Sequence, residues 1–375
     1  MRLVRVGIIG LGLMGTRYVK YFEEGKVDGA TLTAVVTSRK EQRDWVNETF
    51  NNNVDVYKNL DELIASGKVD AIIVATPHYH HPAAAIQAFQ AGYHVLIEKP
   101  AGVYTKQVRE MNETALKSGK VFGIMYNQRT NPLYMKLRDI IQSGELGEIY
   151  RTNWTVSNWF RTQSYYDAVS WRSSWNTDGG GVLMNQSPHQ LDLWQWTTGM
   201  IPKRIRAFCH FGKYHNIEVE DDVTAYVEYE NGATGVFITS TGEAPGTNRY
   251  EISGTQGKIV IENNKLSFWR LRESTYEFNE RYKDGGFSKP ECWECEIPIQ
   301  GEAKDGHLEV IVDWIDSIRN RTPLLSPGEE GMKGLMMANA MLLSTWTDNW
   351  VELPIDEDLF YEYLIKKIKS SEQKE

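Results

Sequence analysis

Lys99 is the residue of this sequence best suited to chemistry, because of the residues around it. The apolar run 95–97 precedes Glu98, Lys99 and Pro100, and such a run is typical of a buried parallel strand. Ligands of open α/β sheets bind beyond the carboxyl ends of these strands, and the proline fixes the backbone torsion after the lysine. A Lys99 ammonium at that place would bond a reacting oxygen and stabilise its developing charge. The alternative is a solvated lysine beside a turn.

His189 is the second candidate, as an acid–base group. A histidine has a reference pKa of ~6.5, which suits proton transfer at neutral pH. His189 follows a glycine run at 179–181, and Asp192 stands three residues after it. If both residues are helical they share one face, where Asp192 would orient the imidazole. The alternative is a buried structural histidine.

A glycine-rich turn near the start of the chain predicts a dinucleotide site. A β-branched run at 2–9 leads into the motif G-x-G-x-x-G, and residues 16–24 read as a helix. The first glycine permits a tight turn, the second lets the backbone approach a pyrophosphate, and the third allows close helix–strand packing. The free N–H groups of the helix would bind the phosphates. The predicted phosphate loop consists of Gly10, Gly12, Leu13, Met14 and Gly15.

The end of the second predicted strand, 32–36, bears on the choice of cofactor. NAD-selective folds usually place an acid there for the ribose 2′-hydroxyl. This chain instead has Ser38 and Arg39, with Arg43 shortly after. A hydroxyl and guanidinium groups suit a 2′-phosphate. The sequence therefore predicts NAD(P) with NADP slightly favoured, and NAD stays open if both arginines are merely exposed charges.

Thr76 and Pro77 follow another apolar run, 69–75, and a histidine cluster comes next. The cluster consists of His78, His80 and His81. Adjacent side chains in an extended segment point apart, and no acidic ligand accompanies these histidines. We therefore expect a loop at the cofactor edge and no metal site.

The chain resembles the glucose–fructose oxidoreductase/inositol dehydrogenase (Gfo/Idh/MocA) family. The features that carry the resemblance are, in chain order, Gly10, Gly12 and Gly15, then Thr76, Pro77 and His81, then the run 91–95 into Glu98, Lys99 and Pro100, and finally Tyr126 and Asn127. The resemblance implies an α/β Rossmann domain that binds the dinucleotide, over 1–126. It also implies a C-terminal α+β domain with an open, mostly antiparallel sheet, over 127–375, for substrate binding and oligomerisation.

The stretch 178–189 looks like the family's segment from Gly-Gly-Gly to His. In the family an Asp four residues before that His commonly works with it as a proton relay, but Asn185 stands here. Asn cannot take a proton, so it would bond a sugar hydroxyl. The resemblance implies catalytic roles for Lys99 and His189. It implies cofactor contacts from Thr76, Pro77, His81, Glu98, Lys99 and Asn127, and substrate contacts from Tyr126, Trp171, Arg172, Asn185 and Asp192.

Composition narrows the class of protein. The formal net charge of −9 argues against nucleic acid or an anionic membrane as the main partner. The three cysteines do not suggest a disulfide framework, and we interpret the pair Cys292 and Cys295 as structural. The start of the chain has no signal-peptide pattern. We expect a cytoplasmic protein whose region 204–261 is rich in strands and whose region 262–300 is irregular.

Together these features predict an NAD(P)-dependent oxidoreductase that acts on a secondary hydroxyl or ketone of a sugar, glycoside or polyol. The resemblance implies a homodimer or homotetramer. One alternative is a redox-neutral glycosidase, which oxidises the sugar transiently and eliminates the aglycone. Another is a non-catalytic NAD(P)-binding sensor or scaffold. The sugar, the carbon oxidised and the direction of the reaction stay open.

Overall fold

The computed structural model of the chain describes residues 2–169, 173–301 and 304–372. It divides into two compact units. Unit 1 contains Met1–Thr130, Thr177–Gly179 and Lys304–Leu335, and unit 2 contains Asn131–Asn176, Gly180–Ala303 and Met336–Glu375. Thr177–Gly179 therefore belongs to unit 1, although the residues before and after it belong to unit 2. Within the described ranges, none of the helices is both long and apolar enough to cross a membrane.

Unit 1 is built around a six-stranded parallel sheet with the order β3-β2-β1-β4-β5-β6. Its strands are β1 (Val4–Ile9), β2 (Ala30–Val36), β3 (Asp55–Tyr57), β4 (Ala71–Val74), β5 (His94–Ile97) and β6 (Phe122–Ile124). This order is that of the Rossmann fold and confirms the fold predicted for this part of the chain. After β3 the chain crosses to the other side of β1, and dinucleotides bind at that switch point.

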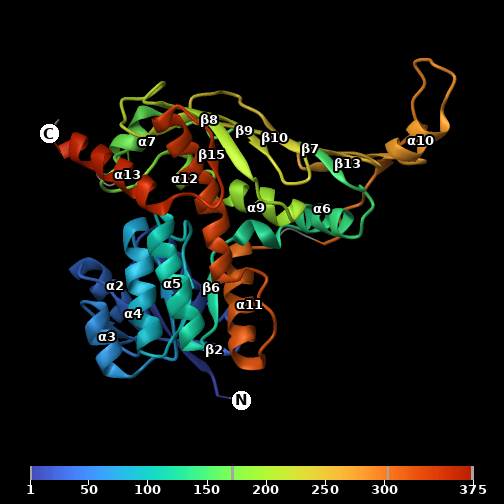
Figure 1. Cartoon of the computed structure of the whole chain (residues 1–375). Coiled ribbons are helices and arrows are strands. Elements are labelled where there is room, and N and C mark those ends of the chain that lie inside the picture. Colours follow the sequence, from blue (N-terminus) through green and yellow to red (C-terminus); the bar gives the residue numbers. More distant parts are fainter. Residues whose placement is uncertain (1, 170–172, 302–303, 373–375) are drawn as a thin grey trace. The chain divides into compact units, whose positions relative to one another are not determined.

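Helices cover this sheet, which explains why its strands are almost wholly apolar. They are α1 (Leu13–Glu23), α2 (Lys40–Thr49), α3 (Leu60–Ser66), α4 (His81–Gln90), α5 (Thr105–Ser118) and α11 (Gly306–Asn320), with short 3₁₀ turns η1 (His78–His80), η2 (Asn127–Thr130) and η3 (Gly328–Glu330). Figure 1 shows α4 and α5 side by side, and α11 next to β6. Trp314 of α11 is fully buried in one core with Ile8 and Leu96.

Local residue chemistry sets several helix ends of unit 1. The Asn59 side chain accepts a hydrogen bond from the Glu62 N–H at 2.9 Å and caps α3. Gly67 and Gly119 end α3 and α5 in the left-handed conformation, at φ of 61° and 64°, where a glycine carries no Cβ penalty. These ends lie where the sequence pattern changes from apolar periodicity to polar turn residues.

Unit 2 is built around a nine-stranded open sheet with the order β14-β13-β12-β11-β7-β10-β9-β8-β15. Its strands are β7 (Ile149–Val156), β8 (Arg204–Phe211), β9 (Glu220–Glu228), β10 (Thr234–Ser240), β11 (Asn248–Gly254), β12 (Gly257–Glu262), β13 (Lys265–Leu271), β14 (Cys292–Glu296) and β15 (Val351–Glu352). β7 and β10 pair in parallel, and the other neighbours are antiparallel. This confirms the predicted open, mostly antiparallel sheet.

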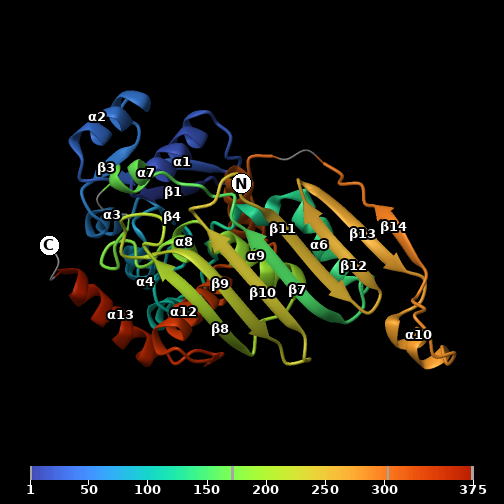
Figure 2. The same cartoon turned by 90° about the horizontal axis from the view of Figure 1, so that it is seen from above.

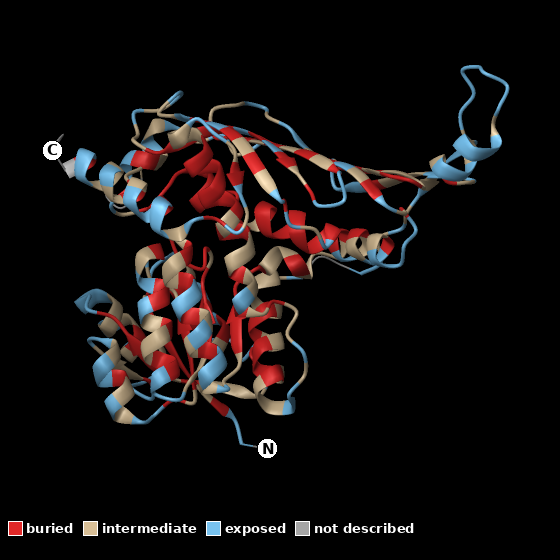
Figure 3. Cartoon of the chain, viewed as in Figure 1, coloured by how far each residue is buried: buried red, intermediate tan, exposed pale blue. Residues whose placement is uncertain are grey.

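One face of the sheet of unit 2 is covered by α6 (Pro132–Gln142) and α9 (Pro188–Thr198), which lie behind the strands in Figure 2. Trp194 of α9 stacks on Phe237 of β10, with ring centroids 5.4 Å apart. Figure 3 shows α9 almost wholly buried. On strands β8 and β9, by contrast, Phe208 and Tyr226 are 53% and 38% exposed. The other helices are α7 (Gln163–Asp167), α8 (Val182–Asn185), α10 (Thr275–Arg281), α12 (Gly331–Thr347) and α13 (Glu357–Glu372).

The prediction that residues 262–300 are irregular is wrong. β13, α10 and β14 lie in this region, and the two strands extend the sheet. Asn263 and Asn264 adopt positive φ values of 50° and 58° and make the tight turn between β12 and β13. Ser274 and Glu277 form a capping box at the start of α10. Since α10 and β14 bury almost nothing, they lack the apolar periodicity by which a sequence reveals such elements.

Candidate active site

The glycine-rich loop lies between β1 and α1, as the sequence predicts. Gly10 has a φ of +87°, and a Cβ there would lie 2.6 Å from the Ala75 carbonyl oxygen. A Cβ on Gly15 would lie 1.9 Å from the Gly10 oxygen, so both positions need glycine for packing. A Cβ on Gly12, by contrast, would meet nothing within 4 Å. The open space at Gly12, beside the first N–H groups of α1, fits the pyrophosphate of a dinucleotide.

The end of β2 carries Ser38 and Arg39, both exposed, directly after the buried Thr37. The Arg43 guanidinium donates a hydrogen bond to the Ser38 carbonyl at 3.4 Å, so the three predicted residues lie together. Gln42, which sequence reasoning missed, donates to the Leu11 carbonyl at 2.6 Å. It therefore ties the end of β2 to the glycine-rich loop.

His81 connects the ends of β4 and β5. Its imidazole lies 2.8 Å from the Pro100 carbonyl through Nδ1 and 2.6 Å from the Thr76 carbonyl through Nε2. Burial lowers the pKa of His81. The side chain is fully buried, so it positions the two strand ends that carry Thr76, Pro77 and Lys99.

Glu98 and Lys99 follow β5 at the carboxyl edge of the sheet. The Glu98 carboxylate is buried; it accepts a hydrogen bond from the Tyr18 hydroxyl of α1 and one from the Lys99 N–H at 3.2 Å. Burial raises the pKa of Glu98. Burial lowers the pKa of Lys99, and the negative charges of Glu98 and Asp178 act against that shift. Both carboxylates therefore favour the charged form of Lys99.

Asp178 and His78 form a buried contact beside His81 that no sequence pattern predicted. His78 Nδ1 lies 3.1 Å from the Asp178 carbonyl oxygen and 3.3 Å from its Oδ1. Burial, together with the neighbouring positive charges of His81 and Lys99, lowers the pKa of His78 to about 3. His78 is therefore neutral at neutral pH. The one feature of the sequence that could have drawn attention to Asp178 is its position directly before the glycine run 179–181.

Tyr126 and Asn127 follow β6 in unit 1. Tyr126 is buried, with the Arg129 guanidinium 5.4 Å from the centre of its ring. Asn127 Nδ2 lies 3.4 Å from His307 Nδ1 of α11. The predicted residues Trp171 and Arg172 lie outside the described residues.

In unit 2, Asn185 and His189 are the accessible residues of the long buried stretch 180–198. Every other residue there is buried, whereas these two are partly exposed. Asp192, which lies with His189 in α9, is buried and accepts a hydrogen bond from Gln195 at 3.0 Å. Of the predicted site residues in this stretch, Asn185 and His189 are therefore partly open to solvent, whereas Asp192 is not.

Glu220 of β9 holds the turn that precedes Asn185. Its Oε1 accepts a hydrogen bond from the Leu183 N–H at 3.0 Å, and a Cβ on Gly181 would lie 1.9 Å from its backbone oxygen. Burial raises the pKa of Glu220 to about 7. Glu220 could not be identified from the sequence, because a glutamate in a strand gives no local sign that its side chain is buried.

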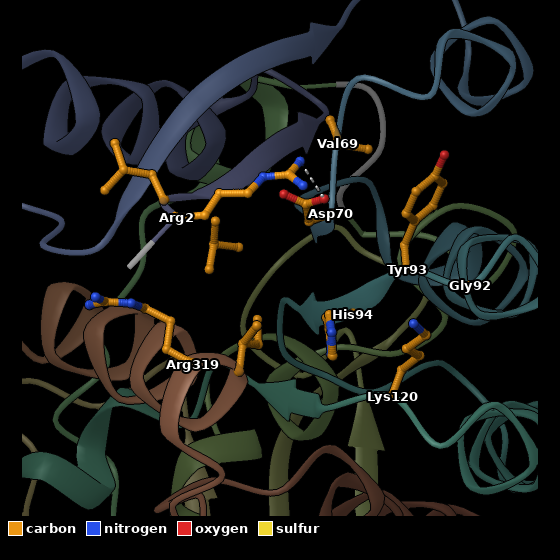
Figure 4. A pocket seen from close by; sticks show the side chains of 11 residues that line it. Arg2, Val69, Asp70, Gly92, Tyr93, His94, Lys120 and Arg319 are labelled. Carbon is orange, nitrogen blue, oxygen red and sulfur yellow. Dashed lines mark ion pairs between the residues drawn. The ribbon is translucent and has the colours of Figure 1, made fainter.

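A cavity of about 360 Å³ lies at the opposite, amino-terminal edge of the sheet of unit 1 (Figure 4). Residues that line it include Val4, Asp70 and His94, at the beginnings of β1, β4 and β5. Asp70 accepts a hydrogen bond from Arg5 at 2.8 Å and pairs with Arg2 at 3.5 Å. This cavity is therefore distinct from the edge that carries Lys99. Across the described part of the chain, no group of three or more His, Cys, Asp or Glu side chains is arranged to hold a metal ion.

Comparison with known proteins identifies relatives along most of the chain. Over 344 residues it is 24% identical to myo-inositol 2-dehydrogenase of Thermotoga maritima, covering 90% of this chain and 95% of that protein. Over 245 residues it is 29% identical to D-glucoside 3-dehydrogenase of Escherichia coli, covering 61% and 68%. The crystal structure of the WlbA dehydrogenase from Bordetella pertussis, in complex with NADH and UDP-GlcNAcA, superposes with a TM-score of 0.79 at 25% identity, over 95% of this chain and all of that one.

Two family models match the chain. Residues 4–126 match the NAD-binding Rossmann fold of an oxidoreductase family, and residues 134–260 match the GFO/IDH/MocA C-terminal domain. Both parts agree with the folds of the two units. The chain belongs to the Gfo/Idh/MocA family of NAD-binding oxidoreductases, whose members act on sugars and polyols.

Proposed function

We propose that the chain is an NAD(P)-dependent dehydrogenase that transfers a hydride between nicotinamide and a secondary hydroxyl or ketone of a sugar, glycoside or polyol. The observation that carries this proposal is the position of Lys99. It follows β5 at the same edge of the sheet as the glycine-rich loop, whose open space at Gly12 fits a pyrophosphate. The relatives named as myo-inositol 2-dehydrogenase and D-glucoside 3-dehydrogenase support this class of substrate.

The roles of the residues follow from their chemistry. The nicotinamide, when bound, accepts or supplies the hydride. Lys99 would bond the reacting oxygen and stabilise its negative charge. His189 would take the hydroxyl proton during oxidation and return it during reduction. Asn185 would hold a neighbouring hydroxyl, since an amide donates and accepts hydrogen bonds without transferring a proton.

For the cofactor, we propose that NADP(H) binds at least as tightly as NAD(H). The three residues after β2 are Thr37, Ser38 and Arg39, so no carboxylate stands there to bond a ribose 2′-hydroxyl. The crystal structure of the WlbA dehydrogenase contains NADH, which supports NAD(H) as a cofactor, so the proposed preference for NADP(H) rests on the residues after β2.

We also propose that the protein assembles through the open sheet of unit 2. Ala225 of β9 and Ala207 of β8 are in register with Phe237, which packs on α9, so the exposed Phe208 and Tyr226, one residue on, lie on the other face of the sheet. A second copy would remove these side chains from water. Light scattering would give the mass of a dimer or tetramer, and a monomer mass at micromolar concentration would contradict this.

The proposed activity is tested by adding the purified protein to NAD⁺ or NADP⁺ with a panel of sugars. The panel contains myo-inositol, methyl glucosides, aryl glycosides and a UDP-linked uronic acid, and nicotinamide absorbance is followed. We expect reduced cofactor to accumulate with at least one of them, and to be lost in Lys99→Ala. Aglycone release without net cofactor reduction would indicate the redox-neutral glycosidase. Tight dinucleotide binding without turnover in either direction would indicate a sensor.

A further inference from the structure

We propose that the cavity at the amino-terminal edge of the sheet of unit 1 binds the phosphate group of a small metabolite, held by Lys120, His94 and Arg2. This is a second binding site, at the edge of the sheet opposite to Lys99, and it does not rest on the proposed activity. The cavity volume of about 360 Å³ lies in the range of small-molecule sites, about 300–1,000 Å³. Its walls come from the start of the chain, from β5, from the turn before β6 and from the end of α11.

The lining of this cavity carries more positive than negative charge. Among the described residues that line it, the cationic side chains are Arg2, Lys120 and Arg319, and the one carboxylate is Asp70. Arg5, beside the cavity, already satisfies that carboxylate with guanidinium hydrogen bonds at 2.8 and 3.1 Å and a backbone N–H at 3.0 Å. The lining therefore has a surplus of two positive charges, although the whole chain has a formal net charge of −9.

Lys120 supplies a charge that no other group neutralises. Its side chain is partly exposed, and across the described part of the chain its ammonium makes no hydrogen bond and no ion pair. Its stem lies along the cavity wall, since a Cβ on the neighbouring wall residue Gly92 would lie 4.0 Å from Lys120 Cε. An ammonium is a compact charge with three donors, which suits the oxygens of a phosphate.

His94 adds a neutral donor to the same cavity. Its Nδ1 accepts a hydrogen bond from the Val121 N–H at 2.9 Å. Burial and the positive charge of Lys120 lower the pKa of His94 to about 4, so the ring is neutral at neutral pH and its one proton resides on Nε2. This N–H has no acceptor among the residues that the structure describes. Figure 4 shows the His94 ring and the Lys120 side chain next to each other, so both donors are available to one ligand.

Arg2 and Arg319 contribute in different ways. The Arg2 guanidinium lies 3.5 Å from the Asp70 carboxylate, which Arg5 already satisfies, and its side chain is 72% exposed. Arg2 is therefore able to turn towards a ligand. Arg319, by contrast, lies against the backbone of Gly29, where a Cβ would be 2.0 Å from its Nη1. It contributes its charge to the cavity and no hydrogen bond to a ligand.

The charge and the donors favour a phosphate over a single carboxylate. A phosphate group carries about −1.5 to −2 charges at neutral pH and three acceptor oxygens, which matches the surplus of two positive charges and the three donor side chains. Tyr93 and Ile318 line the rest of the wall, and the Tyr93 ring is held by a hydrogen bond from its hydroxyl to the Ile64 carbonyl at 3.3 Å. This apolar wall suits the carbon skeleton of a phosphate ester.

The test measures how fast an amine-specific reagent labels Lys120, by peptide mass spectrometry, with inorganic phosphate or glycerol 3-phosphate present. Sodium chloride at the same ionic strength is the reference, which corrects for charge screening. We expect both phosphates to slow the labelling of Lys120 in a saturable way. Labelling of Lys117, exposed in the last turn of α5, is the internal control and should not change. Arg2→Gln should raise the half-protecting concentration about tenfold, as expected for the loss of a charge-assisted hydrogen bond.

A second measurement uses urea unfolding with and without phosphate. A ligand that binds only the folded protein stabilises it, so phosphate should stabilise Lys117→Ala more than Lys120→Ala, and general salt effects cancel in this comparison. Neither measurement needs turnover, and phosphate bound at the glycine-rich loop would leave Lys120 exposed to the reagent. Labelling of Lys120 at the reference rate in both phosphates would overturn the proposal. Stronger protection by citrate than by either phosphate would overturn the assignment to a phosphate ligand.

Discussion

The Tyr18 hydroxyl donates a hydrogen bond to the Glu98 carboxylate, and both side chains are buried in unit 1. Tyr18 lies in α1, the helix that begins at the glycine-rich loop, and Glu98 directly precedes Lys99. This bond therefore connects the helix that would bind the dinucleotide phosphates to the strand end that carries the proposed oxyanion-stabilising lysine. Burial raises the pKa of Tyr18 well above its ordinary value, so the phenol stays a donor.

Replacing Tyr18 by Phe should destabilise the protein in a pH-dependent way. The variant leaves a buried carboxylate without this donor, which costs about 1–3 kcal/mol. The Tyr18 hydrogen bond also lowers the pKa of Glu98, against the larger effect of burial, so its loss raises that pKa further. When a carboxyl group has a raised pKa in the folded state, the folded protein loses stability as pH rises from the ordinary carboxyl range towards that pKa. Urea unfolding should therefore show that the variant loses more free energy of unfolding at neutral than at mildly acidic pH.

Tyr21→Phe in the same helix is the matched control. Its hydroxyl donates to Asp305, which is about one-third exposed, so water can replace the lost donor. We expect Tyr21→Phe to lower the free energy of unfolding by a smaller amount, which does not depend on pH in this range. Equal losses for the two variants would mean that the bond between Tyr18 and Glu98 adds nothing specific to the site.

Glu220→Gln should flatten the pH dependence of stability. Burial raises the pKa of Glu220 from 4.5 to about 7, so the folded state is penalised progressively as pH rises through that window. The penalty is roughly 3 kcal/mol above pH 7, at about 1.4 kcal/mol per unit. Gln keeps an oxygen for the Leu183 N–H but does not ionise. Glu228→Gln, in the same strand but paired with Arg204 at 2.8 Å, should not change the slope; a slope retained in Glu220→Gln would contradict the prediction.

The features of this protein that depend on a local sequence pattern could be predicted from the sequence. Continuous apolar runs marked the parallel strands, and three glycines marked the phosphate loop, where Gly10 and Gly15 are required by packing and Gly12 by an open approach. Lys99 could be identified because a strand end has a fixed place in an α/β sheet. Asn185 and His189 came from the family's pattern, and the fold leaves them accessible.

Contacts between residues far apart in the sequence could not be predicted from local patterns. Asp178 and His78 are a hundred positions apart, and Tyr18 and Glu98 are eighty apart. The periodicity of a sequence does not reveal which buried polar groups are in contact, because such contacts depend on how helices and strands pack together. The same reason applies to α11, whose Trp314 enters the core of unit 1 from far along the chain. β14 was missed for the opposite reason: it is mostly exposed and carries no apolar pattern.

Arg39→Asp should shift cofactor preference towards NAD. The carboxylate would accept a hydrogen bond from a ribose 2′-hydroxyl and repel a 2′-phosphate. Loss of a charge-assisted bond costs about 1.5–3 kcal/mol, so NADP(H) affinity should fall at least tenfold. Calorimetric titration of both cofactors measures this. Much tighter binding of NAD than of NADP by the unmutated protein would contradict the proposed preference.

Lys99→Ala should remove turnover while leaving dinucleotide binding largely intact. Loss of an oxyanion-stabilising donor costs about 2.7–4 kcal/mol, or 10²–10³ in rate. Lys99→Arg keeps the charge, but its planar, bulkier head cannot take the position of the ammonium, so it should be nearly as inactive. Single-turnover rates with cofactor bound measure both variants. Near-normal turnover in Lys99→Ala would mean that the end of β5 is structural.

Variants of Asn185 and His189 should differ in their kinetic effects, because one residue is proposed to bind the substrate and the other to transfer a proton. His189→Ala removes the proposed acid–base group, which contributes typically 10²–10⁴-fold, so kcat should fall and the acid limb of the pH profile should flatten. Asn185→Ala removes a group that holds a hydroxyl without moving a proton, so KM should rise more than kcat falls. Asn185→Asp should keep most activity if the relay geometry of the family persists. These effects are measured as separate kcat and KM values across pH. A His189→Ala variant with an unchanged acid limb would assign the proton to another group.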